Sequence, residues 1–476
     1  MPRYEDSEKG DEKKKMKEPF LWKEDKKEHK EEEDGALFTV LLSTAVAVCG
    51  SFAFGTCIGY SAPTQDAIMM DLQLSYAQYS VFGSILNIGA ILGAITCGNI
   101  ADFLGRKGAM RISAFVCILG WIAIYMAVES VMLDFGRFLS GYGIGVFSYV
   151  VPVYIGEITP TSLRGGLASA NQLLIVIGLG SSYILGAFIS WRMLALTGII
   201  PCMFVFLGLF FVPESPRWLL MAGRSEDFLV ALQHLRGPDT DITREAENIK
   251  DYLESLKGLP KVTFIKMFDK ANIHPLTISV GLMAFQQLVG INGIVFYANY
   301  IFKSAGFDPS KGTIIYAILQ IVITAVGASI VDKAGRRPLL LTSAAGLLMG
   351  NLLIASSFFL KAREISPDIV PYIAVIGVLV YIGSFSVGMG AGPWLIMSEV
   401  FPLHIKGMGG SLVTITNWSG SWLVSYTFNF LMLWSSYGTF LLYASVCALA
   451  IVFIYNMVPE TKGKTLEEIH ASMNSS

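Results

Sequence analysis

Long apolar segments constrain this chain more than any other feature of its sequence. Twelve of them are each roughly twenty residues long, the length that an α-helix needs to cross a bilayer hydrocarbon core about 30 Å thick. They are apolar throughout and do not alternate with a period of two, which favours helices over a β-barrel. The expected spans are 37–60, 78–101, 110–127, 131–155, 168–190, 193–212, 274–302, 311–332, 338–360, 370–397, 409–433 and 438–457. The sequence therefore predicts an all-α membrane protein with twelve transmembrane helices.

Polar segments divide these helices into two groups of six. Only 15% of the residues are charged, against about 25% in an average soluble protein, and most of them lie outside the apolar segments. The start of the chain is mostly Lys, Glu and Asp, which is typical of disorder. The expected units are a disordered tail (1–35), an N-terminal six-helix bundle (36–212), a linker with short helices (213–273), a C-terminal six-helix bundle (274–457) and a second tail (458–476).

The distribution of basic residues predicts the orientation in the membrane. An even number of helices puts both ends of the chain on one side, and short cytosolic loops collect Lys and Arg. The side opposite the tails holds few basic residues, namely Arg192, Lys303, Lys311, Lys361 and Arg363. Both tails and the linker are therefore expected in the cytosol of a multi-pass protein. The sequence leaves open whether the membrane is vacuolar or plasma membrane.

Three short charged patterns occur twice, in the same order. The sequence DFLGRK at 102–107 recurs as DKAGRR at 332–337. GEITPTSLRGG, with Glu157 and Arg164, recurs as SEVFPLHIKGMGG, with Glu399 and Lys406, and VPESPRW recurs as VPETKGK. The order favours two parallel six-helix bundles related by a pseudo-two-fold axis. Secondary transporters of one large class are built this way, with the site between the halves near the membrane midplane.

The repeated charges form a candidate gate at the cytosolic ends of the helices. Acids and bases there can pair across helix ends, and such a network could hold the cytosolic side closed and break as it opens. Exposed ion pairs contribute only about 0–1 kcal/mol each, and shielded ones more. The alternative is that the basic residues only set topology. The candidate gate residues are Asp102, Arg106, Glu157, Arg164, Glu214, Arg217, Asp332, Arg336, Arg337, Glu399 and Lys406.

Side-chain amides inside an apolar helix suggest a binding site for a neutral polar molecule. Gln286, Gln287 and Asn292 lie in one predicted span. Amides both donate and accept hydrogen bonds, as sugar hydroxyls do. Residues 287 and 292 are expected to approach one inner surface. Hydrogen bonds between helices are an equally good explanation from the residues alone.

These patterns resemble the sugar porter family of the major facilitator superfamily, over essentially the whole chain from about residue 40. PESPRW, QQLVGING and PETKG carry the resemblance, and SYVVPVYIGEITPTSLRGG is most similar to the plant early-response-to-dehydration-like monosaccharide transporters. The resemblance implies the major facilitator fold and alternating-access transport of a monosaccharide, expected to be a hexose such as glucose. It implies sugar contacts at Gln172, Gln286, Gln287, Asn292, Gln320, Trp394 and Asn417.

The resemblance also bears on the energy source. Arg137 lies within a predicted helix and needs a partner, for which Asp134, one turn earlier, is the candidate. The two are expected either to form a structural pair or to belong to a proton site. Proton-coupled relatives use an Asp of the first helix with this Arg, but Cys57 stands there, and 36–65 contains no acid. Facilitated diffusion is therefore expected, with proton coupling and a non-transporting sugar sensor as alternatives.

Other functional classes lack support in the sequence. The six cysteines all lie in apolar segments and form no C-x-x-C pair, and the histidines show no metal-ligand spacing. No nucleophile triad or phosphate-binding loop is present, so neither an enzyme nor a cofactor is expected. Basic residues do not gather on one soluble surface, which argues against nucleic acid. The expected partners are a small-molecule sugar and the lipid bilayer, with the protein acting as a monomer.

Overall fold

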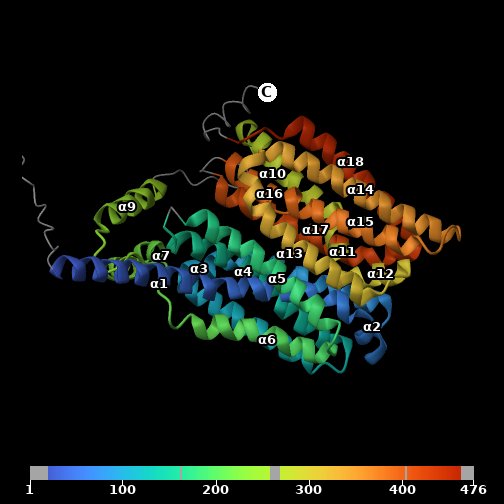
Figure 1. The fold of residues 1–476 in the computed structure, drawn as a ribbon, viewed down its shortest axis with the longest axis horizontal. Helices are drawn as coiled ribbons and strands as arrows, with labels where there is room; N and C mark the ends of the chain where they lie inside the picture. The colour runs from blue at the N-terminus through green and yellow to red at the C-terminus, as the bar shows by residue number, and fades with distance from the viewer. Residues whose placement is uncertain (1–19, 161–162, 258–267, 402–404, 463–476) are drawn as a thin grey trace, which may run out of the picture.

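The computed structural model describes residues 20–160, 163–257, 268–401 and 405–462, and the regular elements in these ranges are all helices. They form two bundles that lie side by side (Figure 1). The N-terminal half contains α1 to α6 and the C-terminal half contains α10 to α18. The helices α7 to α9 lie near one end of the pair, here named the linker end, and α2 and α12 lie at the opposite end, here named the α2–α12 end (Figure 1).

The N-terminal half crosses the membrane six times. Its elements are α1 (Phe20–Gly59), α2 (Ser61–Asp71), α3 (Tyr76–Tyr125), α4 (Ser130–Ile158), α5 (Arg164–Gly186) and α6 (Trp191–Gly208). A straight helix with the 50 residues of α3 would be about 75 Å long at 1.5 Å per residue, far more than one membrane crossing. Its backbone turns at Gly105, where φ is 80° and ψ is 171°, so α3 provides two crossings.

The C-terminal half also crosses six times, but two of its spans are broken. Its elements are α10 (Lys270–Leu288), α11 (Ile291–Phe296), α12 (Ala298–Ala305), α13 (Pro309–Ala334), α14 (Arg336–Ala362), α15 (Val370–Ser384), the π-helix η2 (Phe385–Met389), α16 (Gly392–Val400), α17 (Lys406–Trp434) and α18 (Ser436–Met457). The first span turns at Gly290, whose φ is 100°. The fourth passes from α15 through η2 into α16.

The predicted number of spans is confirmed. Ten described helical segments are long and apolar enough to cross a membrane, and α3 is one of them. Because α3 crosses twice, and because α17 has 29 residues and packs against α3 and α10, the total is twelve. The two bundles, of six spans each, have the twelve-helix architecture that the sequence predicts.

Between the halves, the linker folds into three helices, α7 (Pro216–Met221), α8 (Ser225–Arg236) and α9 (Thr243–Lys257). They share a small apolar core that includes Trp218, Phe228 and Ile249. Arg236 at the end of α8 donates to the backbone oxygen of Ile158, 3.0 Å away, and pairs with Glu245 of α9. The linker is thereby attached to the end of α4.

One predicted boundary needs correction. The sequence predicts disorder over residues 1–35, but helix α1 begins at Phe20 and is continuous with the first membrane span. Lys and Glu, which dominate this stretch, are strong helix formers, and a preformed span removes the cost of nucleating a new helix. Residues 1–19 lie outside the described part of the chain.

Candidate functional site

A chain of three amide side chains lies between α10, α11 and α17. Asn292 Nδ2 donates to Gln287 Oε1 at 2.5 Å, and Gln287 Nε2 donates to Asn417 Oδ1 at 2.6 Å. Gln287 can approach α17 closely because Gly420 lies at the contact, where an added Cβ would lie 2.7 Å from the Gln287 Cβ. Three of the residues predicted to bind sugar therefore lie together in one cluster, here named the amide cluster.

Gln286 connects the amide cluster to the break in the fourth C-terminal span. Its Nε2 donates to the backbone oxygens of Met389 and Gly390, at 2.6 and 2.8 Å, and its Oε1 accepts from Gln287 at 3.1 Å. A π-helix and the break after it free carbonyl groups that need donors within the membrane. The Gln286 Nε2 group is such a donor, and its hydrogen bonds connect α10 to the broken fourth span.

The other predicted contact residues lie on helices around the cluster. Gln320 on α13 is buried, and its Oε1 has no hydrogen-bond partner among the described residues. Trp394 on α16 is half-buried and packs against the apolar cluster that contains Met283 and Val413. Each of these positions belongs to the C-terminal half.

Gln172 lies on the other half, on the face of α5 that is directed at α13. Gly180, two turns further along α5, packs against Ala317 and Ile321 of α13, and Tyr183 packs against Tyr316. Residues 172, 176, 180 and 183 share one face of a helix. The last three are buried, whereas Gln172 is exposed. The halves therefore touch at the end of α5 and leave the Gln172 level open.

Aromatic side chains join the halves beyond the amide cluster, toward the α2–α12 end. The rings of Phe54 and Trp418 lie 5.9 Å apart, and Trp418 directly follows Asn417 in the sequence. The rings of Tyr79 and Tyr297 lie 6.3 Å apart. All four residues come from spans that face the opposite half. These contacts close the passage between the halves on that side of the cluster.

Hydrogen bonds and an ion pair complete this closure. Tyr183 donates to the backbone oxygen of Val295, and at the rim Lys303 of α12 pairs with Asp66 of α2. The Asp66 partner raises the pKa of Lys303 above its usual value by accepting a hydrogen bond from it. These contacts lie near the ends of α5, α11 and α12, on the same side of the amide cluster as the pair of Tyr79 and Tyr297.

At the linker end, the described ion pairs of the two bundles lie within each half. Arg106 of α3 reaches Glu157 of α4 with two nitrogens, each 2.9 Å from a carboxylate oxygen. Arg336 of α14 is 3.3 Å from Glu399 of α16. The two pairs occupy equivalent places in the repeat. Asp102 adds a longer contact of 3.4 Å to Arg106.

A second acid in each half holds the turn before these arginines. Glu214 accepts from the backbone nitrogen of Lys107 at 3.1 Å, and Glu460 accepts from those of Arg336 and Arg337 at 3.0 and 3.2 Å. Burial raises the pKa of Glu214, although backbone donors oppose this. At Glu460 burial also acts to raise the pKa, but the four backbone donors around it prevail and the pKa is lowered.

The glycines of the repeated pattern make room for these acids. Gly105 and Gly335 have φ values of 80° and 88°, which favour glycine. A Cβ at Gly105 would lie 2.4 Å from Glu214 Oε2, and one at Gly335 would lie 3.0 Å from Glu460 Oε2. The repeat thus encodes a turn whose backbone donors bind an acid from the end of the sixth or twelfth span.

The described pairs among the predicted gate residues join neighbouring helices of one bundle. Glu157 and Glu399 pair with Arg106 and Arg336, since these side chains meet at the ends of neighbouring helices in one bundle. The side chains of Arg164, Asp332 and Lys406 lie outside the described part of the chain. Predicted gate residues also contact aromatic rings, with Arg217 over Tyr252 at 5.6 Å and Arg337 over Tyr455 at 5.4 Å.

Of the two alternatives for Arg137 and Asp134, the structural pair is not formed among the described residues. Arg137 is fully buried, and its guanidinium extends toward α1, where it donates to the backbone oxygen of Cys57 at 2.6 Å and to the Ser61 hydroxyl. The ring of Phe82 lies 5.1 Å from the charge. Within the part of the chain that the structure describes, Asp134 Oδ1 is buried without a hydrogen-bond partner, because the Arg137 guanidinium bonds to the α1 carbonyl instead.

Sequence reasoning missed several polar residues of this arrangement. Glu460 belongs to the repeated VPETKGK pattern, and its equivalence to Glu214 was the available signal. Ser215 donates to Glu157 at 2.6 Å. Asn87 and Asn429 are buried amides in membrane spans, the same signal that marked Gln287.

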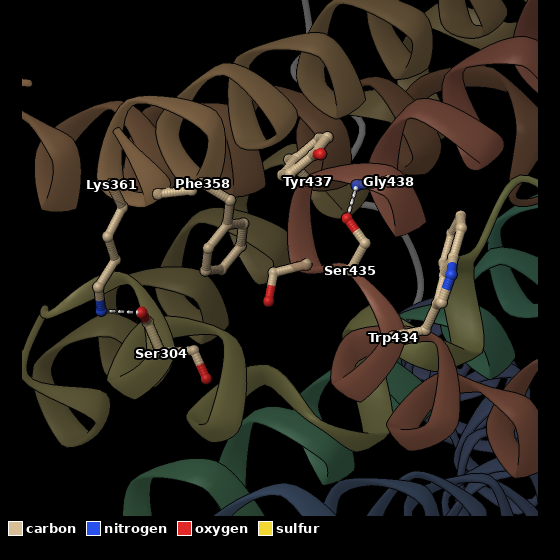
Figure 2. A pocket seen from close by; sticks show the side chains of 9 residues that line it. Ser304, Phe358, Lys361, Trp434, Ser435, Tyr437 and Gly438 are labelled. Atoms are coloured by element: carbon tan, nitrogen blue, oxygen red, sulfur yellow. Dashed lines mark hydrogen bonds between the residues drawn. The ribbon is translucent and has the colours of Figure 1, made fainter. Parts of the chain in front are cut away.

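A separate cavity of about 600 Å³ lies at the α2–α12 end of the C-terminal half. It is lined by Phe358 and Lys361 of α14, by Ser304 of α12 and by the connection from Trp434 to Gly438 (Figure 2). Lys361 is directed at the backbone oxygen of Ser304 (Figure 2). The amide-cluster residues are not among its lining residues. Among the described residues there is no His, Cys, Asp and Glu grouping fit to hold a metal ion.

Comparisons with known proteins agree with this fold. The chain is 60% identical to sugar transporter ERD6-like 8 of Arabidopsis thaliana, over 96% of this chain and 97% of that protein. It is 58% identical to ERD6-like 7 of the same plant, over 91% and 94%.

Among solved structures, the inward-open xylose transporter XylE from E. coli matches with a TM-score of 0.78 at 26% identity, covering 91% of this chain and 99% of that one. The proton:xylose symporter XylE bound to 6-bromo-6-deoxy-D-glucose matches with a TM-score of 0.73 at the same identity and coverage. A family model described as "Sugar (and other) transporter" matches residues 15–473. With this match over nearly its whole length, the chain belongs to the sugar transporter family of the major facilitator superfamily and is not an enzyme.

Proposed function

We propose that this protein carries a monosaccharide, in particular a hexose such as glucose, across a membrane by facilitated diffusion. The observation that carries the proposal is the chain of hydrogen bonds from Asn292 through Gln287 to Asn417. Each of these amides has a donor and an acceptor group, and so does each hydroxyl of a neutral sugar. A bound sugar would replace the amide–amide hydrogen bonds with hydrogen bonds to itself.

The surrounding residues divide the remaining roles. Gln172 is exposed on the opposite half and would close on the sugar from there, while the unpartnered Gln320 Oε1 offers an acceptor. Trp394 provides an aromatic face for the C–H groups of the ring. Gln286 is held by the carbonyls of Met389 and Gly390, and its role is to position Gln287 rather than to bind the sugar alone.

The contacts between the halves define the state of the cycle. We assign the linker end to the cytosol, because most basic loop residues lie there. The halves are then joined on the extracytosolic side, and Gln172 is open toward the cytosol, which is an inward-facing arrangement. The pairs Arg106–Glu157 and Arg336–Glu399 persist in it, so they fasten each bundle as a rigid unit. Charges that join the two bundles would have to form in the outward-facing state.

The absence of an acid in the first span supports facilitated diffusion over proton coupling. Arg137 donates to the Cys57 carbonyl and to Ser61, and no carboxylate occurs between Ala36 and Gln65. Proton coupling is the second candidate, because the similar XylE is a proton:xylose symporter by its description and because Asp134 carries a buried oxygen without a partner. A non-transporting sugar sensor has no specific observation in its favour.

The remaining features of the proposal concern placement and assembly. The protein is placed in the vacuolar or plasma membrane with both tails in the cytosol, and one chain contains the whole amide cluster, so a monomer is the functional unit. The test is uptake of labelled hexoses by the purified protein in liposomes, with and without a pH gradient. Saturable uptake that ignores the pH gradient supports the proposal. Uptake that requires the gradient identifies a proton-coupled carrier, and no uptake of any hexose contradicts the proposal.

A further inference from the structure

A buried polar contact joins α3 and α17, outside the amide cluster. Asn87 of α3 is fully buried, and its Nδ2 donates to the Ser425 hydroxyl at 3.0 Å. Ser421, one turn earlier on α17, donates to Asn87 Oδ1 at 2.8 Å. Both ends of one amide on the N-terminal half are thus satisfied by two hydroxyls of the C-terminal half.

The same two helix faces meet again nearer the α2–α12 end. Asn429 Nδ2 donates to the Ser80 hydroxyl at 3.0 Å, and both residues are buried. Residues 80 and 87 lie two turns apart on one face of α3, and 421, 425 and 429 follow at single turns on α17. Together these five residues form a line of polar contacts between the halves, here named the polar seam.

The chemistry of the seam suits a surface that must open and close. Apolar surfaces resist separation into water in proportion to their area. A hydrogen-bonded amide or hydroxyl exchanges its partner for water at a small net cost, so it specifies the closed geometry without locking it. A buried polar group that loses its partner is unfavourable, so each contact also depends on the exact alignment of the other half.

We propose that Asn87 is a positioning residue of the transport cycle, which sets the balance between the inward-facing and outward-facing states. This inference rests on the proposed alternating-access function. The hydrogen bonds of Asn87 to Ser421 and Ser425 exist only while the halves meet on the extracytosolic side. Their loss therefore weakens the inward-facing state and leaves the outward-facing state, where water replaces them, unchanged.

A matched control lies within one half. Asn351 of α14 is also fully buried, and it donates to the Cys447 sulfur of α18 at 3.4 Å. Both partners belong to the C-terminal bundle and stay together in either state. Replacing Asn351 with Ala should lower the stability of the fold without changing the balance between states.

The experiment measures accessibility of a cysteine placed in the seam. Ser84 lies on the same face of α3, is buried, and donates to the backbone oxygen of Val81 in its own helix. A Ser84→Cys reporter is made in a background with Cys49→Ser, because Cys49 is the only one of the six cysteines that is not fully buried. The full-length protein in liposomes is labelled by an impermeant maleimide from the extracytosolic side.

Asn87→Ala should raise the labelling rate about tenfold, the effect of losing two buried hydrogen bonds. In Asn87→Ala the Ser421 hydroxyl has lost its acceptor, Asn87 Oδ1. Adding Ser421→Ala removes this hydroxyl and should therefore reverse part of the rise in labelling rate. Asn351→Ala should not change the rate. Equal rates for Asn87→Ala and the parent, in protein that keeps its elution profile and thermal melt, would overturn the inference, as would an equal rise in Asn351→Ala.

Transport kinetics give a second readout that a merely structural role would not move. Favouring the outward-facing state should lower the KM for extracytosolic sugar and raise it for cytosolic sugar in Asn87→Ala. Equal changes of KM on both sides would contradict the inference. Because labelling needs no sugar, a protein that labels as expected but carries no sugar would count against the proposed function alone.

Discussion

Gln287 donates a hydrogen bond to Asn417, and the two residues are 130 positions apart on helices α10 and α17. The amide pair is only part-buried, and the neighbouring Asn292 donates to the same Gln287 side chain. Amide groups that are bonded to one another at an accessible surface are ready to exchange those bonds for others. This relationship links the fold to the proposed sugar site.

Gln287→Ala should lower the kcat/KM of hexose uptake about 10- to 100-fold. The substitution removes a donor and an acceptor, each worth about 1 kcal/mol, and leaves Asn292 and Asn417 without their partner. Uptake by purified variants in liposomes measures the effect. Gln233→Ala, in linker helix α8, is the control amide and should transport normally. Normal uptake by Gln287→Ala would remove this residue from the site.

Gln286→Ala should reduce transport and also lower the thermal stability. Its Nε2 satisfies the carbonyls of Met389 and Gly390 at the break in the fourth C-terminal span, and a buried acceptor left without its donor costs about 1–3 kcal/mol. The melting temperature of the detergent-solubilised protein should fall in Gln286→Ala more than in Gln287→Ala. The opposite ranking would contradict the role of Gln286 in holding the broken span.

Gly105→Ala should destabilise the protein and weaken transport. The added Cβ would lie 2.4 Å from Glu214 Oε2 at a backbone φ of 80°, so the turn must shift and Glu214 must leave the Lys107 nitrogen. With a ψ of 171°, this backbone conformation is open essentially to glycine alone, and an L-residue held there costs on the order of 1–3 kcal/mol before any clash. Gly98→Ala, on the same helix with no atom within 4 Å of the new Cβ, is the control. Equal melting temperatures for the two variants would refute the role of the turn.

Reversal of one charge in the rim pair should favour the outward-facing state. Lys303 and Asp66 join the two halves with side chains that are 59% and 55% exposed, and such a pair contributes at most about 1 kcal/mol, equivalent to about fivefold in the balance of states. Asp66→Lys should raise extracytosolic labelling of the Ser84→Cys reporter. Asp66→Lys combined with Lys303→Asp should restore the parent rate. A double variant that labels as fast as the single one would show that the ion pair has no part in closure.

The overall architecture follows from the sequence because it rests on strong local signals. Spans of about twenty apolar residues leave few alternatives to membrane helices, and the recurrence of DFLGRK as DKAGRR marks equivalent turns in the two halves. The structure explains why the pattern recurs, because Gly105 contacts Glu214 and Gly335 contacts Glu460, each an acid that follows the last span of its bundle.

Pairing between distant residues was less predictable. Arg137 and Asp134 lie one helical turn apart, yet the arginine bonds to the Cys57 carbonyl, because burial against α1 outweighs proximity in the sequence. Glu157 similarly bonds to Arg106 on the neighbouring helix. A one-dimensional pattern shows which residues need partners, whereas helix packing decides which partners they find.

The amides illustrate the same limit within the candidate site. Gln287 and Asn292 stood out because they lie in an apolar helix, and the structure places both in the amide cluster. Asn87 carries the same signal, but only its contacts with Ser421 and Ser425 show that it belongs between the halves. The helical segment that precedes the first span, from Phe20, also lacked an apolar pattern to reveal it.

The most direct test of the central claim is equilibrium exchange of labelled glucose by the purified protein in liposomes held at one pH on both sides. The account predicts saturable exchange without any ion gradient, inhibited by excess unlabelled hexose and about 10- to 100-fold weaker in Gln287→Ala. Exchange that is absent for every hexose tested, or that is undiminished in Gln287→Ala, would contradict it.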